Sequence, residues 1–164
     1  MKKIIALCLF SIIACKNESQ EVKNEEKTEK DTVYNKTDND SVALDFFDGL
    51  PPETDGCMET CTYDTNTTAD SAKVIYISNL QDLALIKING TMIRMQKDTL
   101  NSKMVNSKEG TDVYTGKEYR SILKYYITKD DEETTESFEF KGNLQILKND
   151  SIRLSIKVKG FGGC

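Results

Sequence analysis

The clearest pattern of apolar and polar positions lies near the C-terminus of the chain. Between positions 138 and 146, and again between 152 and 158, apolar residues occupy alternate positions and polar residues lie between them. A period of two predicts strands with one buried face, and the Asn149-Asp150 turn signal between the runs predicts an antiparallel hairpin. Gly142 interrupts the first run and predicts a bulge or a bend, as at the corner of a barrel.

A second hairpin is predicted upstream, because Asn89-Gly90 separates two apolar runs within 84–95, which is typical of a type I′ turn. No window has the spacing of a long amphipathic helix, and turn signals follow one another closely. The remaining expected elements are strands at 74–78 and 119–128, weaker strands at 42–47 and 61–63, and an acidic loop at 129–135. The expected fold is therefore all-β, a small antiparallel meander barrel or sandwich of about seven to eight strands.

The N-terminus has a different pattern, an almost wholly apolar run over 4–13 behind two lysines. As a helix this run would be about 15 Å long, half of a bilayer core, so it predicts a signal peptide rather than a spanning helix. The following Ile12-Ile13-Ala14-Cys15 resembles the lipobox of bacterial lipoprotein precursors. That resemblance implies a diacylglycerol on the Cys15 sulfur, cleavage before it, and acylation of the new N-terminus. An ordinary secretory signal that happens to contain Cys15 is the alternative.

Residues 16–41 hold eight acidic residues, five lysines and three larger apolar residues, which predicts a disordered, extended tether. The expected organisation is a signal peptide at 1–14, the lipidated cysteine and acidic tether at 15–41, and a single β domain at 42–164. Two or more acyl chains anchor a protein stably to a bilayer. Lipoproteins that are retained in the inner membrane carry an aspartate directly after the lipidated cysteine, whereas position 16 is a lysine. By this resemblance we expect a lipid anchor in the outer membrane, on its periplasmic or cell-surface face.

The charge balance narrows the classes of partner. The chain has 27 acidic and 22 basic residues, and loss of Lys2 and Lys3 with the signal leaves 20 basic residues and a net charge of −7. Such a chain repels phosphate backbones, so we expect a basic protein rather than nucleic acid as a macromolecular partner. Histidine is absent from the sequence, which excludes Ser-His-Asp and Cys-His catalysis and every histidine-ligated metal site.

Acidic residues are the remaining candidates for chemistry. Those at 130–136 have oxygens that suit Ca²⁺, but the EF-hand spacing is missing and we interpret the run as a solvated hairpin loop. Nothing in the sequence places two carboxylates across a cleft, as a glycoside hydrolase would need. We therefore expect no catalytic residue, no metal and no cofactor, and keep a carboxylate-dependent hydrolase as a remote alternative.

Three cysteines follow Cys15, at positions 57, 61 and 164, and export would place them where disulfides form. Cys57 and Cys61 would lie about 13 Å apart in a strand, too far to bridge each other. We predict that Cys164, behind a glycine-rich segment, pairs with Cys61 or Cys57, and that the remaining thiol is buried. A three-thiolate metal site is the competing interpretation.

A short motif recurs five times: Asp, then Ser or Thr, then an aliphatic residue or Ala. It resembles the O-glycosylation acceptor of some exported bacterial proteins, but turn chemistry is the favoured interpretation, because Asp and Ser or Thr are typical of turns that precede strands. The acceptor hydroxyls would be those of Thr32, Ser41, Ser71, Thr99 and Ser151.

The stretch from 84 to 135 resembles, more distantly, the membrane-bound inhibitors of C-type lysozyme, which are small lipoproteins with an eight-stranded barrel. In those proteins a Ser-Gly-x-x-Tyr loop and a Thr-Lys-Gly loop enter the enzyme cleft. The resemblance implies that Thr115, Gly116 and Tyr119 form the first loop and that Lys129 is the inserting lysine. Thr115 replaces the serine, Asp130 replaces the second glycine, and 96–112 is an insertion.

These observations predict an exported, membrane-anchored lipoprotein with a non-enzymatic role, either binding another macromolecule or supporting the envelope. Inhibition of a basic enzyme such as lysozyme is the first alternative, because a negative chain would attract it.

Overall fold

The computed structural model describes residues 41–65, 73–130 and 137–164. These residues form one 3₁₀ turn and nine strands: η1 (Pro52–Thr54), β1 (Met58–Tyr63), β2 (Val74–Ser78), β3 (Leu83–Ile88), β4 (Thr91–Lys97), β5 (Lys103–Met104), β6 (Glu109–Gly116), β7 (Tyr119–Asp130), β8 (Ser137–Lys148) and β9 (Ser151–Gly163). No helix within these ranges is long and apolar enough to cross a bilayer.

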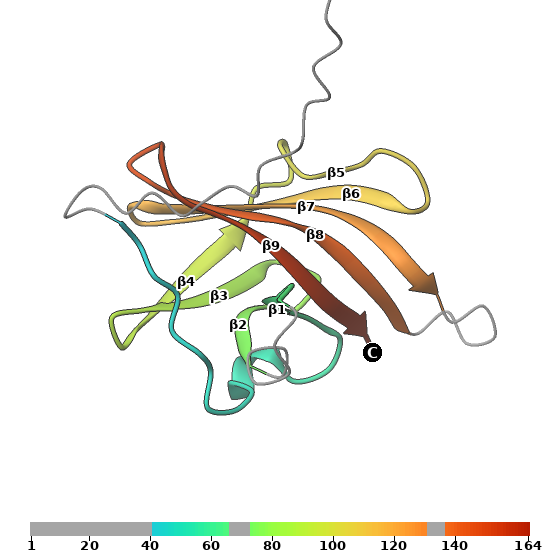
Figure 1. The fold of residues 1–164 in the computed structure, drawn as a ribbon, viewed down its shortest axis with the longest axis horizontal. Helices are drawn as coiled ribbons and strands as arrows, with labels where there is room; N and C mark the ends of the chain where they lie inside the picture. The colour runs from blue at the N-terminus through green and yellow to red at the C-terminus, as the bar shows by residue number, and fades with distance from the viewer. Residues whose placement is uncertain (1–40, 66–72, 131–136) are drawn as a thin grey trace, which may run out of the picture. The chain divides into compact units, whose positions relative to one another are not determined.

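The strands form one antiparallel sheet in the order β4-β3-β2-β1-β9-β8-β7-β6-β5 (Figure 1). An additional pairing of β4 with β6 closes eight strands into a barrel, and β5 lies outside the ring as a short partner of β6. Each strand of the ring is paired with its neighbour in sequence except at β4–β6, where β5 intervenes, and at β1–β9, where the first and last strands meet. The all-β prediction is confirmed, and of the two architectures that it left open, barrel or sandwich, the structure is the barrel.

The alternation seen in the sequence sets which side chains face inward. On β8, Phe140, Leu144 and Ile146 are buried in the core, whereas Glu139 and Lys141, on either side of Phe140, are exposed. The cluster inside the ring also includes buried residues of other strands: Tyr76, Ile86, Met95, Tyr114, Leu123 and Val158.

Both predicted hairpin turns are present. Asn89 and Gly90 have φ values of 49° and 74°, and Asn149 and Asp150 have φ values of 50° and 61°. Left-handed backbone at two successive residues defines a type I′ turn, whose twist matches that of the flanking strands. The local sequence therefore determines the register of these two hairpins.

Three sequence predictions are wrong in detail. Residues 42–47 do not join the sheet: the backbone amides of Asp45 and Phe47 donate to the carbonyl oxygens of Lys87 and Val74 (2.8 and 2.9 Å), with Val42 and Leu44 buried in the core cluster. Closure of the ring leaves this segment no free edge to extend. Instead, β6 supplies the eighth strand of the ring, and β7 continues through Asp130 into the predicted acidic loop.

The bulge expected at Gly142 is also absent. The register shifts on β8 and β7 fall between residues 146 and 147 and between 127 and 129, while Gly142 pairs regularly with Tyr125. A Cβ at position 142 would overlap the carbonyl oxygen of Lys124 and lie 3.2 Å from the Tyr125 Cβ. This glycine therefore permits close packing rather than an irregular strand.

Gly116, at the end of β6, allows β4 and β6 to approach each other. A Cβ there would overlap the carbonyl oxygen of Arg94 and lie 3.0 Å from the Met95 Cα. Because backbone atoms cannot move aside easily, we expect Gly116→Ala to lower the free energy of unfolding by about 1–3 kcal/mol, measured by urea denaturation. Gly49→Ala is the matched control, since nothing lies within 4 Å of its Cβ position. Equal effects of the two substitutions would contradict this explanation.

The cysteine prediction is resolved in favour of one alternative. Cys57 and Cys164 form a disulfide across 107 residues, and Cys61 is a buried free thiol. Cys57 directly precedes β1 and Cys164 directly follows β9, where Met58 is paired with Gly163. The bridge therefore fastens the seam at which the first and last strands close the barrel.

Several predictions lie outside the described residues. They are the signal peptide, the acylated Cys15, the tether up to residue 40, the acceptor candidates Thr32 and Ser71, and the acidic residues at 131–136.

Candidate functional site

One end of the barrel has polar side chains at inward-facing positions. Glu59 on β1 is paired with Ser78 on β2, and Lys97 on β4 is paired with Tyr114 on β6. Glu59 is 1% exposed, and neither of its carboxyl oxygens has a hydrogen-bond partner among the described residues. Burial of an unpaired charge is costly, so the protonation state of Glu59 is the first question at this end.

Loss of hydration, together with repulsion from the Asp112 carboxylate, raises the pKa of Glu59 to about 8, although the Lys97 ammonium opposes the change. The carboxyl is therefore mostly neutral at pH 7. Burial, and then the proximity of Glu59, also raises the pKa of the Cys61 thiol. A protonated, buried thiol is a poor nucleophile, which fits a packing role for Cys61.

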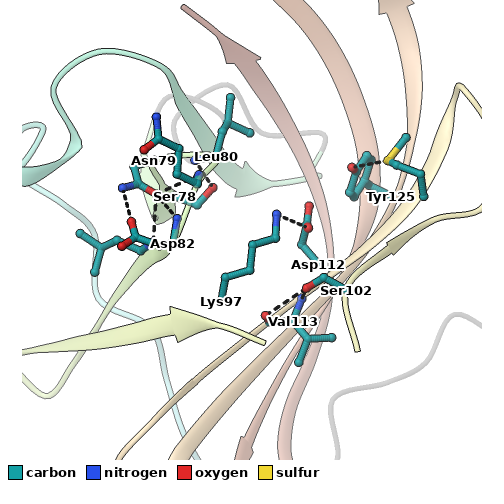
Figure 2. Close-up of polar contacts among 12 residues, drawn as sticks. Ser78, Asn79, Leu80, Asp82, Lys97, Ser102, Asp112, Val113 and Tyr125 are labelled. Atoms are coloured by element: carbon teal, nitrogen blue, oxygen red, sulfur yellow. Dashed lines mark hydrogen bonds and ion pairs between the residues drawn. The ribbon is translucent and has the colours of Figure 1, made fainter. Parts of the chain in front are cut away.

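Lys97 and Asp112 form the main ion pair at this end of the barrel (Figure 2). The Lys97 Nζ lies 2.9 Å from the Asp112 Oδ1, with side-chain exposures of 21% and 14%. Burial lowers the pKa of Lys97, but the hydrogen bond and the charge of Asp112 outweigh it and raise that pKa overall. Nearby, the Ser102 hydroxyl accepts a bond from the Val113 amide (2.9 Å) and fastens the β4–β5 connection to β6.

The outer wall of the barrel has a groove of about 320 Å³ over four neighbouring strands, β1, β9, β8 and β7. We call it the lysine groove, and its lining residues are Thr60, Thr62, Thr128, Glu139, Phe140, Lys141, Lys159, Gly160 and Phe161. This volume lies at the lower end of the range found for small-ligand sites. The phenyl ring of Phe161 on β9 contributes an apolar surface to this lining, and that side chain is 49% exposed.

The groove brings two like charges together. Lys141 and Lys159 are directly opposite each other on β8 and β9. Like charges in opposed positions destabilise a sheet. Lys141 also forms an ion pair with Asp64 (3.4 Å), whereas Lys159 forms none within the described ranges. The hydroxyl of Thr128 donates to the carbonyl oxygen of Glu139 (3.1 Å) and that of Thr62 to the carbonyl oxygen of Lys159 (3.4 Å), which leaves their lone pairs as acceptors.

The residues predicted to enter a lysozyme cleft are not brought together. Thr115 and Tyr119 line a second groove, of about 270 Å³, at the β6–β7 turn, and Gly116 lies beside them in β6. Lys129 is ten residues further along β7, about 33 Å away for an extended strand. There it lies 3.7 Å from the Glu139 carboxylate.

The second groove contains two carboxylates, those of Glu118 and Asp150. Each is paired with a cation: Glu118 with Lys148 at 3.7 Å, and Asp150 with Arg120 at 3.6 Å. Asp150 is also 84% exposed. A general acid needs a desolvated position facing the substrate, and these two paired surface carboxylates do not provide one.

Three of the acceptor candidates lie among the described residues, and Ser41, Thr99 and Ser151 are all exposed. The Asp98 carboxylate before Thr99 accepts bonds from the backbone amides of Leu100 and Asn101, both at 3.2 Å. Hydrogen bonds from Asn101, led by its side chain, lower the pKa of Asp98. This is the turn chemistry that the motif also indicated.

The sequence did not indicate the lysine groove or the buried Glu59. Lys141 and Lys159 occupy the polar positions of two alternating runs and have the pattern of an ordinary solvent face. Only the register of β8 against β9 places them opposite each other. Glu59 is a charged residue at an inward position of β1. Because it interrupts the apolar side of that strand, it also made the strand harder to predict from the sequence.

No protein-family model matches the chain, and searches of curated proteins and of solved structures found no significant match.

Proposed function

We propose that this chain is an exported lipoprotein, anchored to the outer membrane through acylated Cys15, whose barrel binds another molecule of the envelope without catalysis. The observation that carries the proposal is the opposed Lys141–Lys159 pair beside exposed Phe161 in the lysine groove. Folding alone does not require two ammonium groups at this position. Residues kept at a cost in stability are typical of binding sites.

Two features support a role without catalysis. Glu59, a carboxylic acid with a raised pKa, is 1% exposed and is therefore not accessible to a substrate. The carboxylates that border a groove, Glu118, Glu139 and Asp150, are all paired with cations. A carboxylate-dependent hydrolase would require a desolvated acid facing a cleft.

The cost of the lysine pair is measurable. We expect Lys159→Gln to raise the free energy of unfolding by about 0.2–1 kcal/mol at low ionic strength, because it removes the repulsion from Lys141. The gain should shrink as salt screens the charges. Lys157→Gln is the matched control: Lys157 lies on the same strand, opposite Asn143, so no such gain is expected. If Lys159→Gln is destabilising, Lys159 has a structural role and the proposed binding site is wrong.

The anchor is tested separately. Cys15→Ser removes the only thiol at the lipobox, so the variant should remain unprocessed and unacylated and should leave the outer-membrane fraction. Fractionation with immunoblotting and mass spectrometry measures both effects. Cys8→Ser, within the signal peptide, is the control and should behave like the parent. Unchanged processing and membrane association of Cys15→Ser would rule out lipid attachment at this residue.

A further inference from the structure

The outer face of β7, β8 and β9 is positive on a chain whose formal net charge is −5. Five lysines point outward from these strands, at positions 124, 129, 141, 157 and 159. Lys129 and Lys141 pair with Glu139 and Asp64, and the other three form no ion pair within the described residues. Beside the lysine groove, Asn143 on β8 is paired with Lys124 on β7 and with Lys157 on β9. These two lysines extend the positive surface.

The groove itself combines three kinds of group. Lys141 and Lys159 supply ammonium donors, the three threonines supply hydroxyls, and the phenyl ring of Phe161 supplies an apolar surface. Ammonium groups bind a carboxylate or a phosphate. Hydroxyls and the Glu139 carboxylate suit the many hydroxyls of a sugar, and the C–H face of a sugar ring suits an exposed aromatic side chain.

From this combination we propose that the lysine groove binds an acidic sugar unit, that is, a sugar ring that carries a carboxylate or a phosphate. This inference rests on the proposed binding function and names its ligand class. The acid group lies between Lys141 and Lys159 and relieves their repulsion, and the ring lies on Phe161. The volume of about 320 Å³ is that of a site for a small ligand.

Titration calorimetry of the full chain at low ionic strength tests the proposal with three probes. Trigalacturonate carries carboxylates, mannose 6-phosphate carries a phosphate, and maltotriose is neutral. We expect at least one acidic probe to bind at about millimolar concentration, as for a ligand of this size, and maltotriose to bind at least about tenfold more weakly. The acidic probe that binds identifies carboxylate or phosphate as the recognised acid.

Variants locate the binding. The double substitution Lys141→Gln with Lys159→Gln should weaken the acidic probe at least about tenfold, and Phe161→Ala should also weaken it. Lys157→Gln, on the same face but outside the groove, should leave the affinity within about twofold. Binding of inorganic phosphate should not respond to Phe161→Ala, because phosphate has no ring to place on it.

Two results would overturn the inference: equal binding of maltotriose and the acidic probes, or acidic binding that the double variant does not change. Absence of binding at about 10 mM acidic probe would also overturn it. If Lys159→Gln nevertheless stabilises the barrel, the ligand class alone is wrong and the proposed function stands. If that variant destabilises the barrel, both fail.

Discussion

Replacing Cys57 with serine is expected to lower the free energy of unfolding by about 4–5 kcal/mol, the largest effect of any single substitution considered for this barrel. The disulfide with Cys164 spans 107 residues and therefore restricts most of the β domain in its unfolded state. It also lies where β1 meets β9, the one pairing in the ring between strands distant in sequence. Loss of the bridge therefore removes a constraint on the unfolded chain and loosens the seam.

Urea denaturation of the full chain, with and without reductant, measures this effect. Reduced parent protein should match Cys57→Ser, and reductant should not change the midpoint of Cys57→Ser further. A parent protein whose midpoint barely responds to complete reduction would contradict the expectation.

The second large effect is a loss of stability as the pH rises. Glu59 has a pKa of about 8 in the folded barrel, whereas the ordinary pKa of a glutamate carboxyl is 4.5. Below pH 4.5 both states bind the proton, and between the two values only the folded state does. The stabilisation is thus fully present below pH 4.5 and is lost as the pH rises through 8. Over this interval the free energy of unfolding should fall by up to about 5 kcal/mol.

Glu59→Gln separates this effect from other titrations. The amide keeps the shape of the neutral acid and cannot ionise, so the variant should show a flatter dependence between pH 5 and 8 and should exceed the parent in stability above pH 8. Glu118→Gln is the control, because Glu118 is half exposed and paired with Lys148 at the surface. Its profile should follow that of the parent. A parent profile that is flat over this interval would show that Glu59 is not protonated in the folded state.

The two effects reinforce each other at the same end of the barrel. Glu59 is the residue after Met58, which is paired with Gly163 next to the disulfide. Reduction of the disulfide should therefore lower the free energy of unfolding more at pH 8 than at pH 5. A looser seam and an ionised Glu59 both favour separation of β1 from β9.

The strand prediction succeeded where inward positions are apolar. On β8 and β9 every second side chain is a large hydrophobic residue or a glycine, so the period of two was visible. On β6 the inward positions are Gly110, Asp112, Tyr114 and Gly116, a series with two glycines and a charged residue. The strand was therefore missed, although it closes the ring through its pairing with β4. The predicted strand at 42–47 failed for the opposite reason, since Val42 and Leu44 alternate and are buried although the segment joins no strand ladder.

The sequence by itself determined the local elements: the alternating strands, the two hairpin turns and the all-β class. These depend on side-chain periodicity and on the backbone preferences of two-residue turns, which act over a few residues. Only the tertiary structure decided which cysteine pairs with Cys164, that Glu59 is buried, and that Lys141 and Lys159 face each other beside Phe161. Each of these depends on the register between strands and on the closure of β1 against β9, which are set by packing of the whole barrel rather than by any short segment.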